Sequence, residues 1–275
     1  MYAYCVMLDV PRDLLLYVSH LLDQERARRG TRRGARLLTC YKQAMFVLAW
    51  FRDRPDVERL GVGFGLSRAT AYRYRDEGIA VLSAQCPTLH EALERAKAEG
   101  LPHLILDGKI VDCDRVRETK TSRRGKDIDA WYAGKTHDFG GLIQALMDPQ
   151  GIPRWVSEVL PGSVHDITAA RELVFAALAP YVNGLAVLAD GGYAGAGHGI
   201  YTPVKKLKGG AELDPDTRTY NKLLRALRCL GERGFALLVQ RWKTLQHVTL
   251  SPHRITDLAR AALVLTQFEH KMITR

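Results

Sequence analysis

Apolar positions recur at helical spacing through the first hundred residues. Together with residue types that favour helix starts, this periodicity predicts five helices, over residues 12–24, 39–52, 56–63, 67–82 and 89–99. Few of these segments alternate in the manner of a strand. The N-terminal third is therefore expected to be all α.

Beyond the breakers Gly100 and Pro102 the pattern changes to shorter apolar runs. Four of them are typical of strands: "LILDGKIV", "DFGGLIQALMD", "RWVSEVL" and "LAVLAD". Asp214 and Pro215 make a good helix start, so one long helix is predicted from there to residue 245, with an irregularity at Gly231. A closing helix is predicted over residues 254–271. Strands that give way to helices indicate an α/β core, with a mixed sheet covered by helices.

Composition narrows the class of protein. The chain has 275 residues, 47% of them apolar, which is enough for one substantial core. No apolar run approaches the roughly 20 residues of a membrane span, and the first residues have no basic flank of the secretory kind. The five cysteines form no CxxC pair, which disfavours zinc and a disulfide framework. We expect a cytoplasmic protein without a membrane partner.

The charge points to a polyanion. The formal net charge is +10, and such charge steers a protein toward phosphate backbones. Ordinary solubility charge could give the same total. The basic residues are gathered, however, into residues 24–36, 120–126 and 204–210, and this clustering favours nucleic acid as the partner.

The segment over residues 56–82 has the cadence of a helix-turn-helix. A short helix ends in "GFG", and Ser67 can cap a second helix. In such motifs the second helix enters the major groove of DNA. Its candidate DNA contacts are Arg68, Thr70, Tyr72, Arg73 and Arg75. The alternative is an amphipathic helical hairpin packed on the core, and the arginines alone do not decide between the two.

Three acids stand in settings that suggest chemistry. Asp107 interrupts an apolar strand, where a carboxylate is costly unless it is paired or holds a metal. Asp190 ends another apolar run, directly before Gly191 and Gly192. Glu232 shares a helical face with arginines and on its own would read as a surface ion pair. Together, three such carboxylates can hold two Mg²⁺ ions for an in-line phosphoryl displacement.

Six segments in order resemble the DDE superfamily of insertion-sequence transposases. They are "LILDGK" at Asp107, "YAGKTHDFGGLIQ", "VLPGSVHDITAAREL", "VLADGGYAG" at Asp190, "TPVKK" and "RALRCLGERGFALLVQRW" at Glu232. The resemblance implies an RNase H-like core, with the first Asp on the first strand, the second after the fourth strand and the Glu on a following helix. It implies that Asp107, Asp190 and Glu232 are the catalytic triad and bind two Mg²⁺ ions, for which Mn²⁺ can substitute.

The resemblance also implies contacts with DNA around the triad. The residues concerned are Lys135, His137, His165, Lys205, Lys206, Lys208, Arg228 and Arg241. A lone loop histidine such as His165 is as often structural, and Tyr193 is as readily a core residue as an active-site one. Related enzymes often have a lysine seven residues after the glutamate, where this chain has Val239. Arg241, Trp242 and Lys243, slightly further on, are expected to supply that charge.

The expected protein is a transposase in three parts. Residues 1–38 form a helical, arginine-rich segment that grips phosphates or a neighbouring subunit, residues 39–100 a helix-turn-helix domain, and residues 101–275 an RNase H-like catalytic domain. It would bind terminal inverted repeats as a homodimer on double-stranded DNA, in the bacterial nucleoid, and would cut and join strands. The alternatives are a relative that only binds DNA as a regulator, and a nuclease that never joins strands.

Overall fold

The computed structural model describes residues 8–122, 125–197, 199–206, 209–210 and 212–273. Its chain divides into two units. The first contains the chain up to Cys86, residues 239–246 and the chain from Asp257, and the second contains residues 87–238 and 247–256. The predicted helix near residue 90 thus belongs with the sheet, while most of the closing helix belongs with the N-terminal helices. Within the described ranges, no helix is both long and apolar enough to cross a membrane.

The first unit is helical, as the apolar periodicity predicts. Its helices are α1 (Arg12–Arg28), α2 (Cys40–Asp53), α3 (Val57–Gly63) and α4 (Arg68–Ser83). Side chains of Thr39, Asp56 and Ser67 accept hydrogen bonds from the first-turn backbone of α2, α3 and α4, which explains why these helices begin where they do. α3 and α4 are joined by a short turn in which Gly65 has a φ of +70°. α3 and α4 are thus two consecutive helices joined by a short turn.

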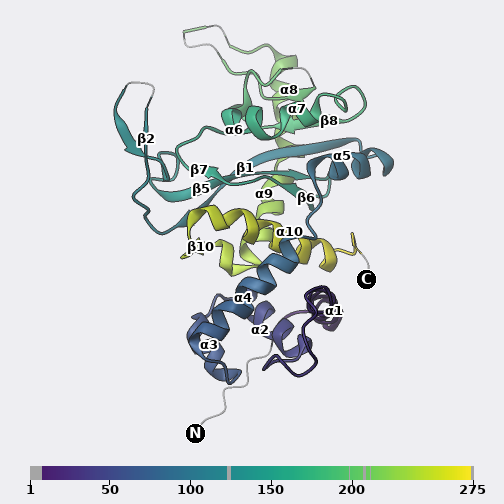
Figure 1. The fold of residues 1–275 in the computed structure, drawn as a ribbon. Helices are drawn as coiled ribbons and strands as arrows, with labels where there is room; N and C mark the ends of the chain where they lie inside the picture. The colour runs from purple at the N-terminus through teal and green to yellow at the C-terminus, as the bar shows by residue number, and fades with distance from the viewer. Residues whose placement is uncertain (1–7, 123–124, 198, 207–208, 211, 274–275) are drawn as a thin grey trace. The chain divides into compact units, whose positions relative to one another are not determined.

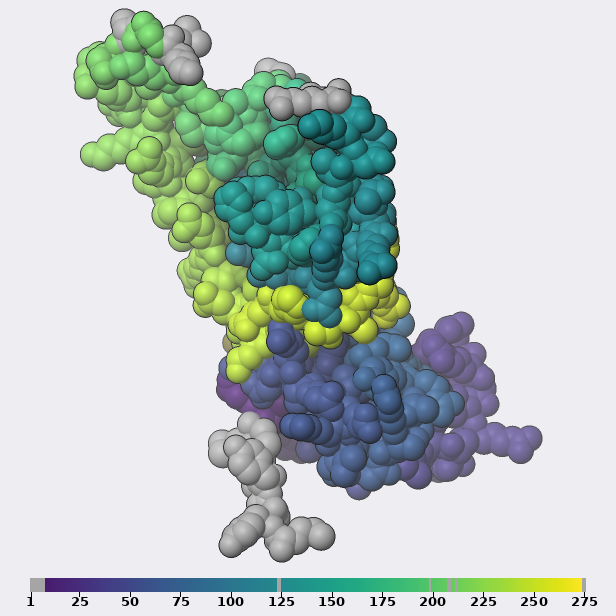
Figure 2. Space-filling model, turned by 90° about the vertical axis from the view of Figure 1, so that its left-hand side faces the viewer, coloured from purple at the N-terminus to yellow at the C-terminus, as the bar shows by residue number. Residues whose placement is uncertain are grey.

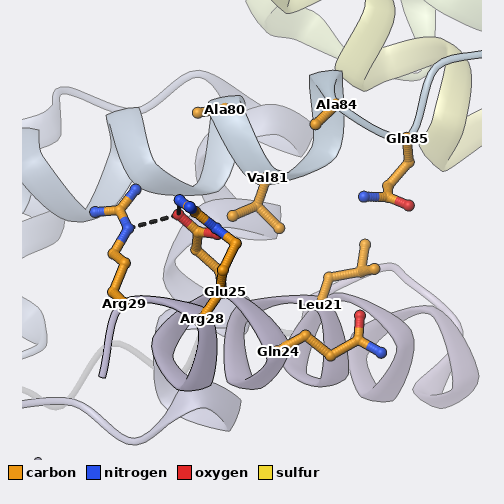
Figure 3. Close-up of a pocket in the computed structure, with 9 residues that line it drawn as sticks. All are labelled: Leu21, Gln24, Glu25, Arg28, Arg29, Ala80, Val81, Ala84 and Gln85. Carbon is orange, nitrogen blue, oxygen red and sulfur yellow. Dashed lines mark hydrogen bonds and ion pairs between the residues drawn. The ribbon is translucent and has the colours of Figure 1, made fainter. Parts of the chain in front are cut away.

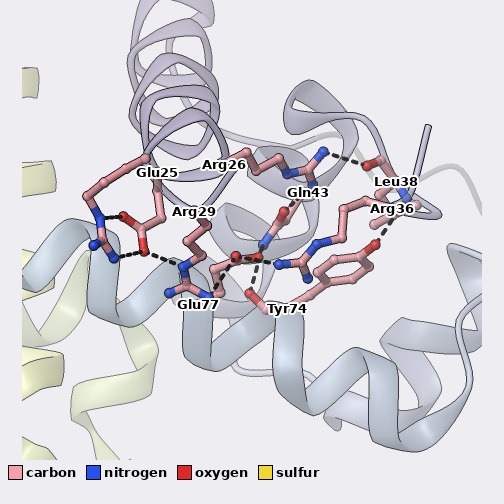
Figure 4. Close-up of polar contacts among 9 residues, drawn as sticks. Glu25, Arg26, Arg29, Arg36, Leu38, Gln43, Tyr74 and Glu77 are labelled. Atoms are coloured by element: carbon pink, nitrogen blue, oxygen red, sulfur yellow. Dashed lines mark hydrogen bonds and ion pairs between the residues drawn. The ribbon is translucent and has the colours of Figure 1, made fainter. Parts of the chain in front are cut away.

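The arginines at the end of α1 and in the loop after it mostly pair with groups inside the first unit (Figure 4). Arg28 and Arg29 pair with Glu25, and Arg29 and Arg36 reach the buried carboxylate of Glu77. Arg26 donates to the backbone oxygen of Leu38 and to the buried Gln43, which itself donates to Glu77. Arg26, Arg29 and Arg36 therefore connect α1 and the loop after it to α2 and α4, which leaves fewer arginines for DNA than the sequence suggests.

A hollow of about 490 Å³ lies between α1 and α4 (Figure 3). Its acid, Glu25, is held by Arg28 and Arg29, whose hydrogen bonds lower the pKa of Glu25 to about 2. The rest of the lining is apolar or amide, including Leu21, Val81 and Gln85. This hollow offers no free carboxylate and is not a candidate for metal chemistry.

The second unit is built on a mixed sheet, as predicted. Its central strand β1 (His103–Cys113) runs antiparallel to β5 (Asp138–Met147) and parallel to β8 (Ala186–Ala189), which pairs in turn with β9 (Ile200–Tyr201). Shorter strands extend this sheet or form a separate ribbon: β4 (Tyr132–Ala133), β6 (Pro153–Val156) and β7 (Leu160–Pro161) on β5, β10 (His247–Val248) on β1, and β2 (Thr119–Thr121) with β3 (Asp127–Asp129). The register of β1 determines which side chains reach each face.

Helices pack on both faces of this sheet (Figure 1). Leu104 and Leu106 of β1 pack with buried residues of α5 (Leu89–Ala98) and α6 (Asp166–Leu173), near α7 (Phe175–Leu178). Side chains alternate along a strand, so Ile105 and Asp107 face the other way. There they meet α9 (Leu230–Phe235), because a Cβ at Gly231 would lie 3.0 Å from Ile105 Cγ2.

The long helix predicted from residue 214 to residue 245 is wrong as one element. α8 (Pro215–Arg228) starts at the predicted cap Asp214, ends before Cys229, and stands on the surface in Figure 2. The six-residue α9 follows, then a π-helical turn over Ala236–Gln240 and a 3-10 turn over Lys243–Leu245. Gly231 and Gly234 allow α9 to lie close to Ile105 and Met147 of the sheet. The closing helix α10 (Ile255–Glu269) is confirmed.

Candidate active site

Asp107 lies where β1 loses one neighbour. β1 pairs with β8 only as far as Leu106, while its pairing with β5 continues to Asp112. Asp107 therefore sits just beyond the end of β8, on the face covered by α9. A Cβ at Gly231 of α9 would lie 3.7 Å from Asp107 Oδ2, so the helix backbone passes directly beside the carboxylate.

Asp190 follows β8 at that same place in the sheet. It caps the 3-10 turn Gly191–Tyr193, and its Oδ1 accepts a hydrogen bond of 2.7 Å from the backbone N–H of Gly192. Because Ala189 is opposite Leu106, the next residue of each strand turns to the α9 face. Asp107 and Asp190 thus point to the same side of the sheet.

Glu232 completes the group. It is exposed on α9, and it lines the same cavity of about 290 Å³ as the two aspartates. The full lining comprises Asp107, Gly108, Lys109, Ile110, Lys135, Thr136, Leu142, Asp190, Arg228 and Glu232. The structure therefore brings together three acids that are far apart in the chain, along with three basic side chains.

The electrostatics of this cavity centre on Asp107. Burial raises the pKa of Asp107 from its usual 3.8 to about 6, and the nearby charge of Asp190 adds to the rise. Arg228, whose Nη1 lies 3.9 Å from Asp107 Oδ2, the backbone N–H of Gly108 and Lys135 act in the opposite direction. The nearby positive charges thus do not fully offset the cost of burying an ionised Asp107 at neutral pH, and a bound cation would stabilise the ionised form.

The donor set suits a hard divalent cation. Carboxylate oxygens are the ligands that Mg²⁺ prefers in proteins, and the three acids of this cavity supply only oxygen. Across the described residues, no three His, Cys, Asp or Glu side chains are already gathered closely enough to hold a metal ion. Binding would therefore require the carboxylates to draw in around the ion.

Asp107→Asn should stabilise the metal-free protein. Above pH 6 the folded state has to accommodate an ionised buried carboxylate, whereas near pH 4 Asp107 is protonated and that cost is absent. The amide should raise the free energy of unfolding by about 3 kcal/mol at pH 8, and by much less at pH 4. Urea denaturation in EDTA at both pH values measures the difference. An equal gain at the two pH values would contradict the assigned cause.

The other predicted site residues are scattered. Lys135 and Arg228 line the cavity, whereas the exposed His137 and His165 do not. A Cβ at Gly191 would lie 3.6 Å from Lys205 Nζ, which places this lysine beside Asp190. Lys206 pairs with Glu212 at 2.6 Å, and Lys208 lies outside the described residues.

Only some of the side chains of α4 that were predicted to contact DNA are exposed. Arg68 and Arg73 are exposed, and Thr70 and Tyr72 are half-buried. Arg75 is buried, with its guanidinium paired with Asp76 and stacked over Trp50 and Tyr72. We therefore leave Arg75 out of the DNA-contacting set.

Arg241 also forms ion pairs within the first unit. Its guanidinium donates to Asp9 and to Glu269, with the closest contact to Glu269 at 2.6 Å. These two acids neutralise the charge that was expected to replace the missing lysine. Arg241 therefore does not offer a free guanidinium for a phosphate.

A polar group lies on the other face of β1, and sequence reasoning left Tyr193 between a core and an active-site role and gave none to Gln144 or Asp166. Gln144 and Tyr193 are fully buried, and Tyr193 Oη donates to Gln144 Oε1 at 2.5 Å. Asp166 lies beside them, where a Cβ at Gly108 would meet all three side chains. The acid in "GSVHD" was the available signal, but strand pairing was needed to place it.

The comparisons with known proteins agree with this geometry. A family model described as DDE superfamily endonuclease matches residues 106–267, which include all three cavity acids. No curated protein and no solved structure matches the chain. The match spans more than half of the sequence and begins at the strand that carries Asp107. The chain therefore belongs to the DDE superfamily endonucleases.

Proposed function

We propose that this protein is a DNA transposase, which cuts DNA at the ends of an insertion sequence and joins the freed ends to a target. The observation that supports it best is the shared cavity of Asp107, Asp190 and Glu232. Family membership gives nuclease chemistry, and the basic charge of the chain suits a DNA substrate.

The three acids would hold two Mg²⁺ ions, for which Mn²⁺ can substitute. Bound there, the ions would activate the attacking oxygen and stabilise the leaving oxygen of the phosphodiester. Asp107 lies within β1 and Asp190 directly follows β8, so the sheet sets the position of both, while Glu232 is supplied by α9. Arg228 and Lys135, from the cavity wall, would face the phosphate oxygens.

Water would be the nucleophile of the first step, and the 3′-hydroxyl that this cleavage frees would be the nucleophile of the second. Both steps are in-line displacements at phosphorus and need no covalent bond to the protein. Holding two transposon ends together requires at least a homodimer on DNA.

One assay separates this proposal from its two alternatives. Purified protein is incubated with Mg²⁺ and a plasmid that carries the insertion-sequence ends. Nicks together with joined products support a transposase, and nicks without joined products support a nuclease. Binding without any nick supports a DNA-binding regulator.

Arg68→Ala and Arg73→Ala should each weaken binding to the terminal inverted repeat. Both side chains are exposed on α4, the second helix of the helix-turn-helix. Each phosphate contact that is lost should lower the slope of log affinity against log salt by about 0.9. Fluorescence anisotropy with a labelled duplex measures this slope. The control is Arg12→Ala, which removes an exposed arginine on α1. An equal loss of affinity in all three variants would mean that α4 contributes no more to DNA binding than other exposed basic residues do.

A further inference from the structure

Gly108 follows Asp107 on β1, and its lack of a side chain leaves space on the opposite face of the strand. If Gly108 had a Cβ, it would overlap the Asp166 carboxylate and lie 2.9 Å from Gln144 Nε2 and 3.1 Å from Tyr193 Oη. These three side chains come from α6, β5 and the turn after β8. The glycine therefore makes room for a polar cluster directly behind Asp107.

Asp166 is the charged member of this cluster, and it also reaches the front of the site. Its Oδ2 lies 3.4 Å from the position of a Cβ at Gly192, and Asp190 Oδ1 lies 2.8 Å from that same position. Both carboxylates therefore lie beside Gly192, and a cation next to such acids favours their charged forms. On the Asp166 side this cation is Lys135, whose Nζ is 3.3 Å from Asp166 Oδ2.

We infer that Asp166 is a positioning residue of this site, which holds the ammonium group of Lys135 at the cavity wall, where it can meet a phosphate of the DNA. The inference rests on the proposed function. The side chain of Lys135 is 65% exposed, whereas that of Asp166 is only 15% exposed. A long exposed lysine samples many rotamers, so a fixed acid partner restricts it to one region of the wall.

The buried amide of Gln144 supports this role. Tyr193 Oη donates to its oxygen, and burial together with the carboxylates of Asp166 and Asp107 raises the pKa of Tyr193, so that the phenol stays a donor. The Nε2 of Gln144 is left without a hydrogen-bond partner in the described structure, although the residue is completely buried. It lies beside the Asp166 carboxylate at the Gly108 gap, and donating to that carboxylate would fix the acid while it holds Lys135.

A double-mutant cycle tests the coupling. Asp166→Asn, Lys135→Gln and the double variant are compared in anisotropy titrations of a fluorescein-labelled duplex with Ca²⁺ in place of Mg²⁺. Each single change should weaken binding about tenfold, and the double variant should be no weaker than either one. Asp129→Asn is the matched control, because Asp129 forms an ion pair of equal length, 3.3 Å, with Arg115 in the same unit. Additive losses would overturn the inference.

Two further readouts separate this role from others. If Asp166 were a metal ligand, Asp166→Asn would raise the Mn²⁺ concentration needed for half-maximal nicking while Lys135→Gln would not, and that result would overturn the inference. A lower melting temperature with unchanged duplex affinity would reduce Asp166 to a structural residue. If Asp166→Asn does not fold, Lys135→Arg carries the test, because it keeps the ion pair and should retain affinity that Lys135→Gln loses. A wild-type protein that binds duplex but never nicks would defeat the proposed function, while the cycle would still report on Asp166.

Discussion

Asp190→Asn should reduce plasmid nicking by about a thousandfold, because it removes one carboxylate from the cavity that would hold the divalent ions. Losing such a ligand costs about 4 kcal/mol of transition-state stabilisation. The fold should survive the change, since the amide oxygen of asparagine can still accept the hydrogen bond that Asp190 Oδ1 receives from Gly192. Initial rates of nicking in Mg²⁺, together with a thermal melt, measure both expectations.

The matched control is Glu172→Gln, at an exposed acid of α6 that lies outside the cavity. It removes the same charge from the same unit and should leave the nicking rate within about twofold, as surface substitutions usually do. If Asp190→Asn nicked DNA as fast as Glu172→Gln does, the cavity could not be the catalytic centre.

The helices and the sheet follow closely from local patterns. Helix caps such as Thr39 and Ser67 are short-range signals that satisfy backbone groups of the first turn, and the structure uses both of them. The apolar runs became β1, β5, β6 and β8 of a mixed sheet, as a strand-forming pattern predicts. Local chemistry thus predicts which elements form.

Pairing between distant elements is what the sequence does not show. The arginines of residues 26–36 look available for DNA, yet Glu77, forty-one residues from Arg36, takes two of them. Arg75 similarly turns to Trp50 of another helix. A cation clustered in sequence can be neutralised by any acid that folding brings near it, so charge density overstates the free basic surface.

Some residues of the candidate site could be predicted from local sequence, and others depend on contacts between distant elements. Asp107 and Asp190 interrupt or end apolar strands, which is a visible local cost, and the structure brings them to one cavity. Asp166 begins a helix, where an acid is favourable in any protein, so its position gave no comparable signal. Its link to Lys135 depends on strand register and on the absence of a side chain at Gly108.

Gly234→Val should lower nicking by about a hundredfold by moving the helix that carries Glu232. A Cβ at Gly234 would lie 2.5 Å from Met147 Cγ and 3.1 Å from the backbone oxygen of Gly151, so α9 could not remain in contact with the sheet. A shift of roughly 1 Å at a catalytic group is enough for such a loss. The overpacking should also lower the free energy of unfolding by about 2 kcal/mol.

Two comparisons make the cause specific. Gly184→Val adds the same side chain to the same unit at a position where a Cβ meets nothing within 4 Å, and it should nick DNA normally. Adding Met147→Ala to Gly234→Val removes the main obstacle, so α9 can return toward the sheet and part of the activity should come back. Because neither Gly234 nor Met147 lines the cavity, such a rescue would show that the distance of α9 from the sheet, and with it the reach of Glu232 toward Asp107, controls the reaction. Normal nicking by Gly234→Val alone would mean that the position of α9 does not limit the chemistry.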